Sequence, residues 1–291
     1  MPLPLVVGTD GSDAALIAVD WAADEAALHG SELRIVYASL WERYEGAARS
    51  LGTGRPAERG MTEHILATAE HRALLRRPGI EVSGEVLAEE AEEALLRLSH
   101  QAAAIVVGSR GRGEFASQLL GSVGLTVAAK ATCPVVVIRG DGADPGDRPW
   151  IALGIDPADG SGDAACVFAF AEARLRGWGV LAVHAWRTPH GVGPDWEGWQ
   201  DSAAHKDHAV ALERLDQALR RPTADFSDVP VKRLMPEGRA HKSLLDAAGG
   251  AGLLVVGARR RRGPAGLQLG PVNHAVLHHA PCPVAVVPDQ A

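Results

Sequence analysis

Three glycines and a serine form the pattern in this sequence that is most capable of chemistry. They read Gly108-Ser-Arg-Gly111, then nine residues, then Gly121-Ser122, and they follow the apolar residues 103–107. Residues without side chains let backbone amides approach an anion, and a helix N-terminus adds unpaired donors and partial positive charge. Between a strand and a helix, this spacing predicts a phosphate-binding loop. A purely structural glycine turn is the alternative.

An aspartate after the first expected strand is the second candidate. Asp10 follows the apolar residues 4–8, and Asp156 repeats it in the second half of the chain. A carboxylate there can accept hydrogen bonds from ribose hydroxyls or contact a metal ion. Alternatively, Asp10 organises a turn and caps the helix that we expect to begin near Asp13. The duplicate at Asp156 favours the ligand role.

Motifs for several other chemistries are absent. No G-x4-G-K-[ST] run occurs, so the Walker motif is absent. A dinucleotide-binding fingerprint would follow the first strand, whereas this glycine loop follows the fourth expected strand, which argues against a dehydrogenase. No G-x-S-x-G elbow presents a nucleophile. Histidines one helical turn apart, such as His274 with His278, have no carboxylate or thiolate at metal-ligand spacing. We therefore expect no catalytic set and no metal site.

The composition excludes further classes. The 291 residues carry a net charge of −7, which argues against general nucleic-acid binding. No apolar stretch approaches the roughly twenty residues that span a bilayer, and no export signal is visible. The three cysteines, Cys133, Cys166 and Cys282, include no Cys-x-x-Cys pair and fit a reducing compartment. We expect a cytoplasmic protein without a membrane or nucleic-acid partner.

The chain consists of two tandem copies of one sequence unit. Residues 6–10, VVGTD, correspond to ALGID at an offset of 146, while VVGSR at 106–110 and CPVVV at 133–137 recur as VVGAR and CPVAV at an offset of 149. Such near-constant offsets indicate tandem duplication. The Gly- and Pro-rich residues 139–149 have linker chemistry. We therefore expect one domain over residues 1–140 and a second over residues 149–291.

Short apolar runs alternate with longer amphipathic ones in each copy, which predicts βαβ crossovers and a parallel sheet covered on both faces. The expected strands are 4–8, 32–38, 80–87, 103–108 and 134–138, then 150–154, 179–185, 229–235, 252–257 and 283–287. Helices are expected over 13–29, 61–76, 90–100 and 121–131. Two long loops are expected at 39–60 and 186–201, and they could act as lids over a ligand or as partner surfaces. We expect their aromatic side chains to pack against another surface; these are Trp41, Tyr44, Trp186, Trp196 and Trp199.

These features resemble the universal stress protein family in its tandem, ATP-binding form. The resemblance covers essentially the whole chain and rests on Asp10, Asp156, the G-x2-G-x9-G-[ST] run and the two Cys-Pro-Val starts of strand five. It implies two Rossmann-like domains of the adenine nucleotide alpha hydrolase-like type, each with a five-stranded parallel sheet. It also implies ATP, alone or with Mg²⁺ or Mn²⁺, as the ligand. Family members dimerise through strand-five edges, and tandem chains mimic that dimer internally; a homodimer of the whole chain is a further option.

The resemblance also assigns residues to the site. Ala38 matches the position whose backbone recognises the edge of the adenine base, while Val107 and Gly108 flank the ribose and α-phosphate. Ser122 donates its hydroxyl to the phosphates. The full expected set in the first half is Gly8, Thr9, Asp10, Ala38, Val107, Gly108, Ser109, Arg110, Gly111, Arg112, Gly113, Gly121, Ser122 and Val123. Arg110 and Arg112 either supply charge to this site or are solvated loop residues.

The second copy departs from the motif. Asp156, Gly257 and Gly270 are kept, but Arg260 replaces the middle glycine and Pro271 replaces the serine. Proline has neither an amide hydrogen nor a hydroxyl to offer a phosphate. The arginines at 259–262 either grip an anion or fill the vacated pocket. We expect a weaker second site and nucleotide stoichiometry nearer one than two per chain.

The expected function is nucleotide-dependent stress regulation with slow or no hydrolysis. Two alternatives stay open at this point. One is a protein that recruits partners without nucleotide, and the other is a slow ATPase, for which the sequence offers no evident base. The protein partner is not identified by the sequence.

Overall fold

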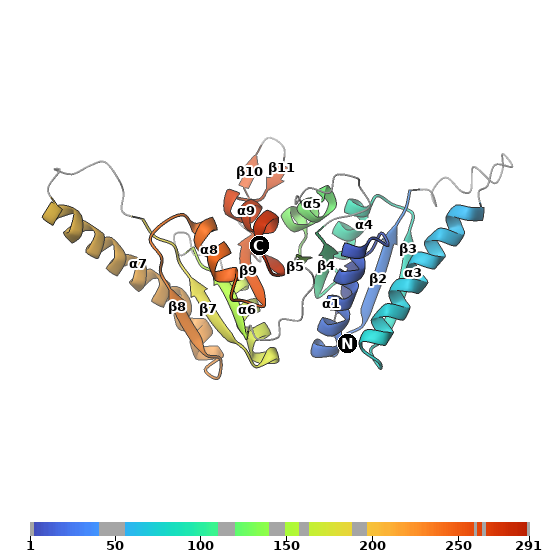
Figure 1. Ribbon diagram of the computed structural model, residues 1–291, viewed down its shortest axis with the longest axis horizontal. Coiled ribbons are helices and arrows are strands. Elements are labelled where there is room, and N and C mark those ends of the chain that lie inside the picture. The colour runs from blue at the N-terminus through green and yellow to red at the C-terminus, as the bar shows by residue number, and fades with distance from the viewer. Residues whose placement is uncertain are drawn as a thin grey trace.

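The computed structural model describes residues 3–40, 56–109, 120–139, 149–156, 163–187, 197–258, 261–263 and 266–289 (Figure 1). It consists of two Rossmann-like α/β halves, in agreement with the fold class predicted from the sequence. Among the helices of the described residues, none combines the length and apolar character needed to cross a membrane.

The first half is a five-stranded parallel sheet with helices on both faces. Its elements, labelled as in Figure 1, are β1 (Leu5–Gly8), α1 (Asp13–His29), β2 (Leu33–Ala38), α3 (Pro56–Arg76), β3 (Val82–Leu87), α4 (Ala91–Leu98), β4 (Ala104–Gly108), α5 (Ser122–Lys130) and β5 (Val135–Ile138). The strands lie in the order β3-β2-β1-β4-β5, and each neighbouring pair is parallel.

The second half repeats this order with one addition. Its elements are β6 (Trp150–Gly154), α6 (Asp163–Arg176), β7 (Gly179–Val183), α7 (Glu197–Asp225), β8 (Val231–Leu234), α8 (Ala240–Ala248), β9 (Leu253–Ala258), β10 (Arg261–Gly263), β11 (Gly266–Gln268), α9 (Pro271–His279) and β12 (Val284–Pro288). The strands β10 and β11 pair with each other as a separate antiparallel hairpin, which the sequence did not predict.

Local sequence explains where the first helix begins and ends. The hydroxyl of Ser12 accepts a hydrogen bond from the Ala15 amide at 3.3 Å and caps the N-terminus of α1. Gly30 ends the helix with φ of 61°, a left-handed conformation that favours glycine. The predicted bounds of this helix, 13–29, are therefore confirmed.

Two helices begin earlier than the sequence led us to expect. The loop predicted over 39–60 ends at Pro56, where α3 begins, and the loop predicted over 186–201 ends at Glu197, where α7 begins. Proline suits the first turn of a helix because its missing amide hydrogen would have no partner there. We expected residues 39–60 to be a loop, whereas Pro56 is the first residue of a helix.

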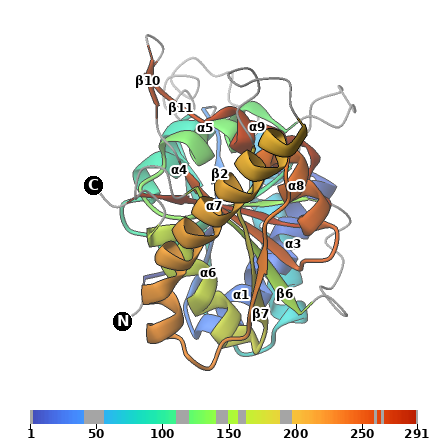
Figure 2. The same cartoon turned by 90° about the vertical axis from the view of Figure 1, so that its left-hand side faces the viewer.

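Helices cover both faces of the sheet, so the strands are buried on both sides. The helices α1, α3, α6 and α7 pack on one face, and α4, α5, α8 and α9 pack on the other (Figures 1 and 2). Alanines let α1 approach the sheet closely, and Ala18, Ala22, Ala23 and Ala26 are fully buried there. A core built from small aliphatic side chains agrees with an aromatic content of only 4%.

The two halves share one sheet. β12 pairs antiparallel with β5, with Val284 opposite Val137, Ala285 opposite Val136 and Val286 opposite Val135. The ten strands therefore form a continuous sheet in the order β3-β2-β1-β4-β5-β12-β9-β6-β7-β8. This is the internal strand-five pairing that the resemblance implied.

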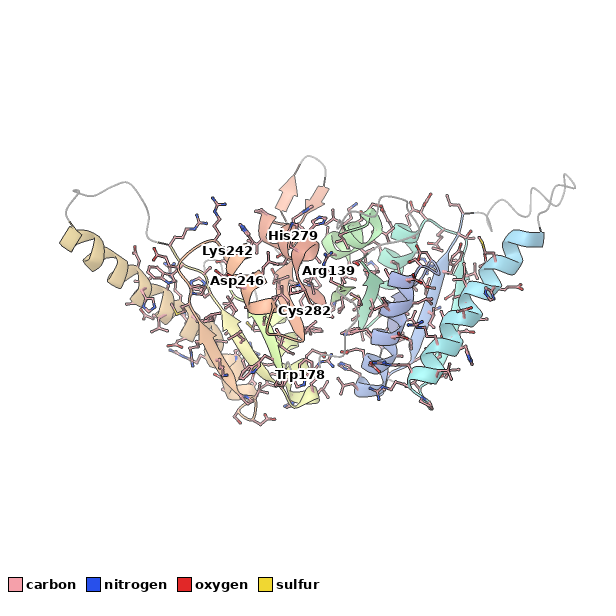
Figure 3. All side chains as sticks on the ribbon, in the orientation of Figure 1. Arg139, Trp178, Lys242, Asp246, His279 and Cys282 are labelled. Atoms are coloured by element: carbon pink, nitrogen blue, oxygen red, sulfur yellow. The ribbon has the colours of Figure 1, made fainter. Side chains whose placement is uncertain are left out.

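A side chain of the first half also caps a helix of the second. Arg139 follows β5, and Figure 3 labels it at the junction. Its Nη1 donates to the Leu277 carbonyl at 2.9 Å and its Nε to the Ala280 carbonyl at 3.2 Å. Both carbonyls lie at the C-terminus of α9, where a cation is favoured by the helix dipole.

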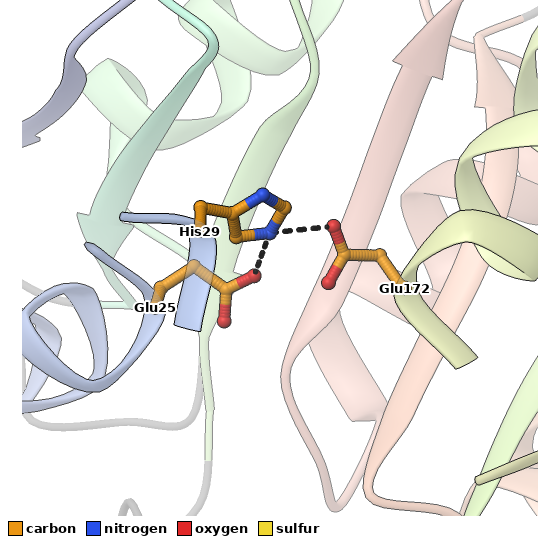
Figure 4. Close-up of side chains that lie close together, drawn as sticks. All are labelled: Glu25, His29 and Glu172. Carbon is orange, nitrogen blue, oxygen red and sulfur yellow. Dashed lines mark hydrogen bonds and ion pairs between the residues drawn. The ribbon is translucent and has the colours of Figure 1, made fainter. Parts of the chain in front are cut away.

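Charged side chains join the halves on the opposite face. His29 Nε2 lies 3.1 Å from Glu25 Oε1 and 3.0 Å from Glu172 Oε1 (Figure 4). Arg176 Nη2 bridges the second oxygens of the same two carboxylates, at 2.5 Å from Glu25 and 3.0 Å from Glu172. Because α1 supplies Glu25 and His29 while α6 supplies Glu172 and Arg176, these four residues form an inter-half charge cluster.

The protonation states follow from this packing. Burial opposes the charge on Glu25, but His29 and Arg176 outweigh it and hold the pKa of Glu25 at about 2. Hydrogen bonds to Glu172 and Glu25 raise the pKa of His29 to about 10. Burial raises the pKa of Glu172. Near neutral pH, protonated His29 and Arg176 therefore provide the positive charge that offsets the buried carboxylates.

Replacing Arg176 by leucine should destabilise the fold. Loss of one partner from a buried charged group leaves the others uncompensated and costs about 3–5 kcal/mol. Urea unfolding should show this loss. The control is Arg221→Leu, whose side chain is 81% exposed and pairs with Asp225, an exchange expected to cost less than about 1 kcal/mol. Equal unfolding free energies for the two variants would contradict the role of the cluster.

The cluster also predicts a dependence of stability on pH. The folded pKa of His29, about 10, lies above its ordinary value of 6.5, so its contribution is complete below pH 6.5 and is lost as pH rises toward 10. The melting temperature of the wild type should therefore fall more steeply across this interval than that of His29→Gln. Parallel curves for the two proteins would show that His29 is not protonated in the folded state.

Candidate functional site

The candidate site lies where the strand order of the first half reverses. After β1 the chain adds β2 and β3 on one side and then returns to place β4 on the other side of β1. In open parallel sheets, ligands bind beyond the carboxyl ends of the strands at this reversal. Gly8 ends β1 and Gly108 ends β4, so the expected residues from both strands meet there.

The turn after β1 is organised by its own side chains. Asp10 Oδ1 accepts a hydrogen bond from the Ser12 amide at 2.9 Å, and Thr9 Oγ1 accepts one from the Gly11 amide at 3.2 Å. Gly11 has φ of 77°, so this turn favours glycine. Asp10 therefore forms the Asx turn that was the alternative to a ligand role, while the cap of α1 comes from Ser12. A carboxylate accepts several hydrogen bonds, so the turn is compatible with a ligand role as well.

Gly108 is where β4 approaches the first turn of α1. A Cβ atom on Gly108 would lie 2.7 Å from the carbonyl oxygen of Ala14 and 2.8 Å from its carbonyl carbon. Backbone atoms in a packed helix cannot withdraw as a flexible side chain can, so only glycine fits. The absence of a side chain on Gly108 therefore has a structural cause, independent of any ligand.

The connection from β4 to α5 is closed by a backbone hydrogen bond. The Gly121 amide donates to the Ser109 carbonyl at 3.1 Å, which brings the exit of β4 next to the N-terminus of α5. Gly121 is the N-cap residue, and within the described residues no side chain caps this helix. Among the described residues, no atom lies within 4 Å of a Cβ built on Gly121, and Ser122 is exposed. The N-terminus of α5 thus has no side-chain cap within the part of the chain that the structure describes.

The other expected residues border this position. Ala38 is the last residue of β2, and Val123 packs partly against the core. Val107 is only 5% exposed, so its side chain belongs to the core and only its backbone could serve a ligand. Arg110, Gly111, Arg112 and Gly113 lie outside the described residues, as do Trp41 and Tyr44 and the side chains of Trp196 and Trp199.

The corresponding position in the second half is filled differently. Pro271 begins α9, and Asp156 is exposed. Asn273 is buried and donates from Nδ2 to the Gly257 carbonyl at 2.8 Å, across the gap between β9 and α9. Its counterpart at an offset of 149 is Gly124. We did not single out Asn273 from the sequence, although an amide side chain opposite a glycine of the other copy was the available signal.

Part of the arginine run forms the unpredicted hairpin. Arg261 and Arg262 belong to β10, which pairs with β11, and β11 contacts α5 of the first half. Arg259 and Arg260, and the side chains of Arg261 and Arg262, lie outside the described residues, so both interpretations of the arginine run stay predictions. Elsewhere in this half, Trp186 packs as expected, since its Nε1 donates to the Met235 carbonyl at 3.1 Å and its ring meets His208 edge-on at 5.2 Å.

Two groups of side chains have the residue types of metal ligands. In the inter-half charge cluster, ligand atoms of Glu25, His29 and Glu172 lie within 4.8 Å of one another. His29 Nε2 lies within hydrogen-bond distance of one oxygen of each carboxylate, so the three side chains already interact directly with one another. His274 and His278 stack at 5.1 Å, but His278 Nδ1 already accepts the Leu120 amide at 3.1 Å.

Comparison with known proteins gives consistent matches over the whole chain. The model of the universal stress protein family matches residues 1–139 and again residues 150–288. A universal stress protein of Mycobacterium tuberculosis is 32% identical over 303 residues, which cover 97% of this chain and 96% of that protein. The crystal structure of a universal stress protein from Archaeoglobus fulgidus covers 99% of this chain and 98% of its own, with 18% identity and a TM-score of 0.69. A second universal stress protein structure from that organism, in complex with dAMP, covers 47% of this chain and 98% of its own, with 26% identity and a TM-score of 0.38.

The two strand-end glycines should respond differently to substitution. Gly108→Ala places a methyl group against the Ala14 backbone and should cost about 1–3 kcal/mol of unfolding free energy. Gly257→Ala is the matched control, because the nearest atom to its new Cβ would be the Ala165 Cβ at 3.9 Å. Denaturant unfolding of the two variants measures the difference. Equal stability would mean that α1 does not approach β4 this closely.

Proposed function

The chain belongs to the universal stress protein family, and from this premise we propose that its first half binds ATP at the junction of β1, β4 and α5. Binding would serve stress regulation in the cytoplasm, with slow or no hydrolysis. The observation that carries the proposal is the N-terminus of α5, which lacks a side-chain cap among the described residues and adjoins the end of β4.

The donors of this site suit a phosphate chain. The first amides of a helix have no partner within the helix, and they combine with the dipole to attract anions. Gly121 has φ of −63° and open space at its Cβ position, so its lack of a side chain is not explained by the fold. Space for a ligand explains it, because a phosphate would approach the backbone there. Ser122 adds an exposed hydroxyl at the same helix end.

The remaining elements suit a nucleoside. Asp10 follows β1, and β1 pairs with β4 in the sheet. The Asp10 carboxylate can accept hydrogen bonds from ribose hydroxyls while it also accepts the Ser12 amide in the Asx turn. Ala38 follows in the adjacent strand β2, where a small side chain leaves room for a purine. We propose that the base lies toward β2 and the phosphates toward α5. Gly111 and Gly113 would complete the phosphate cradle.

We further propose that the second half binds ATP weakly or not at all. Its helix α9 begins at Pro271, which has no amide hydrogen to donate. The Asn273 side chain joins α9 to β9 through the Gly257 carbonyl, a contact that Gly124 cannot make in the first half. Regulation by one nucleotide per chain then follows from the divergence of the two copies.

Calorimetric titration of ATP into nucleotide-free protein tests the proposal. We expect about one ATP per chain for the wild type. Gly121→Glu should abolish binding, because it places a carboxylate beside the phosphates without a clash against the protein. Gly270→Glu, the matched change at a position that is equally open, should bind like the wild type.

Three outcomes would contradict parts of the proposal. Wild-type protein that binds no ATP would refute the site itself. Two equivalent sites would refute the loss of binding in the second half. Normal binding by Gly121→Glu would place the nucleotide elsewhere in the chain.

A further inference from the structure

A histidine of the second half holds the residue that precedes α5 in the first half. The backbone amide of Leu120 donates to His278 Nδ1 at 3.1 Å, across 158 residues of sequence. The Leu120 side chain is 7% exposed and belongs to the buried cluster that also contains Val276 and Leu277 of α9. The amide of Leu120 is therefore anchored on α9, and its side chain is buried.

The anchored residue stands directly beside the proposed phosphate site. Gly121 follows Leu120 and donates its own amide to Ser109. The two peptide planes that precede α5 are therefore held by hydrogen bonds. The Leu120 amide is held by His278 of the second half, and the Gly121 amide is held by Ser109 at the end of β4. The direction of the next amides, which are those proposed to meet phosphate, depends on both contacts.

The first half in turn fixes the position of the histidine. Arg139 donates to the carbonyls of Leu277 and Ala280, on either side of His278 in sequence. The His278 ring also stacks on His274 at 5.1 Å. His278 is therefore held in place from two directions and is not a freely rotating surface side chain.

The contact runs in one direction only. At the offset of 149, Leu120 corresponds to Leu269 and His278 corresponds to Ala129. An alanine side chain has no acceptor, so the first half cannot hold the Leu269 amide in the same way. The copy without the full glycine motif therefore supplies this contact to the copy that has it.

We propose that His278 is a positioning residue of the first-half nucleotide site, and that the second half sets ATP affinity through its hydrogen bond to the Leu120 amide. The inference rests on the proposed ATP site. It assigns the degenerate half a regulatory task, because any event that moves α9 changes the phosphate site.

The hydrogen bond requires that His278 Nδ1 carries no proton. Burial lowers the pKa of His278, and His274, Arg139 and His279 lower it further, so the ring is neutral at neutral pH. The other titratable side chains on the neighbouring helices are His241, Lys242 and Asp246 of α8 and Lys130 of α5; Figure 3 labels Lys242, Asp246 and His279. Protonation of Nδ1 would turn the acceptor into a donor and break the contact. ATP affinity should therefore fall in mildly acidic solution.

Three variants separate the acceptor from the bulk of the side chain. His278→Ala removes the acceptor, while His278→Asn keeps an oxygen at about the reach of Nδ1. His279→Ala is the control on the same helix, because His279 is exposed. ATP affinity is measured by calorimetry from mildly acidic to mildly alkaline pH, and amide hydrogen exchange of the segment around Leu120 is measured without nucleotide.

We expect His278→Ala to bind ATP roughly tenfold more weakly, in line with the loss of one partly buried hydrogen bond. His278→Asn and His279→Ala should stay within about twofold of the wild type at neutral pH. The acid-side loss of affinity should be smaller in His278→Asn than in the wild type, since the asparagine does not titrate. The Leu120 amide should exchange faster in His278→Ala only.

Two results would overturn the inference while leaving the ATP site intact. One is wild-type affinity and wild-type Leu120 exchange in His278→Ala. The other is equal weakening in the alanine and asparagine variants, which would assign the effect to packing. Wild-type protein that binds no ATP would overturn the proposed function and this inference with it.

Discussion

The antiparallel pairing of β5 with β12 is the constraint on which the rest of the structure depends. The facing residues Val135 to Val137 and Val284 to Val286 are at most 1% exposed, so neither strand could stand as a free edge without exposing an apolar ladder. Their pairing turns two five-stranded units into one ten-stranded sheet. The same pairing brings α1 against α6 on one face, and on the other it brings α5 against β11 and Leu120 to His278 of α9.

A shared sheet also explains why the two copies could diverge. Once the halves are joined, a residue in one copy can serve the other, so the two copies no longer need identical sites. Gly108 is confined by the α1 backbone, whereas Gly257 has room for a side chain. Asn273 joins α9 to β9 through the Gly257 carbonyl, where the first half has Gly124. His278 serves the first half directly. The copy without the full glycine motif thus supplies a contact to the copy that has it.

Much of the fold was predictable because its signals are local. All ten strands of the main sheet lie within two residues of their predicted bounds, since continuous apolar runs bounded by turns are typical of buried parallel strands. The signals failed where one residue type has two meanings. Residues 56–60 were expected to belong to a loop and form the start of α3. The arginines near residue 261 indicated a loop and belong in part to a hairpin. At the candidate site, the sequence identified Asp10 and Gly121 but did not reveal Ser12 as the cap of α1 or Asn273 as the side chain in the second gap.

The sequence by itself determined the tandem repeat, the α/β class and the position of the glycine motif between a strand and a helix, because periodicity and backbone freedom are properties of neighbouring residues. Only the tertiary structure decided which side chains of one half meet the other. The cluster of Glu25, His29, Glu172 and Arg176 and the bond from Leu120 to His278 join residues about 150 positions apart. No spacing rule covers such distances. These contacts arise from the register of β5 on β12 and from the packing of helices on the shared sheet, which exist only once the chain has folded.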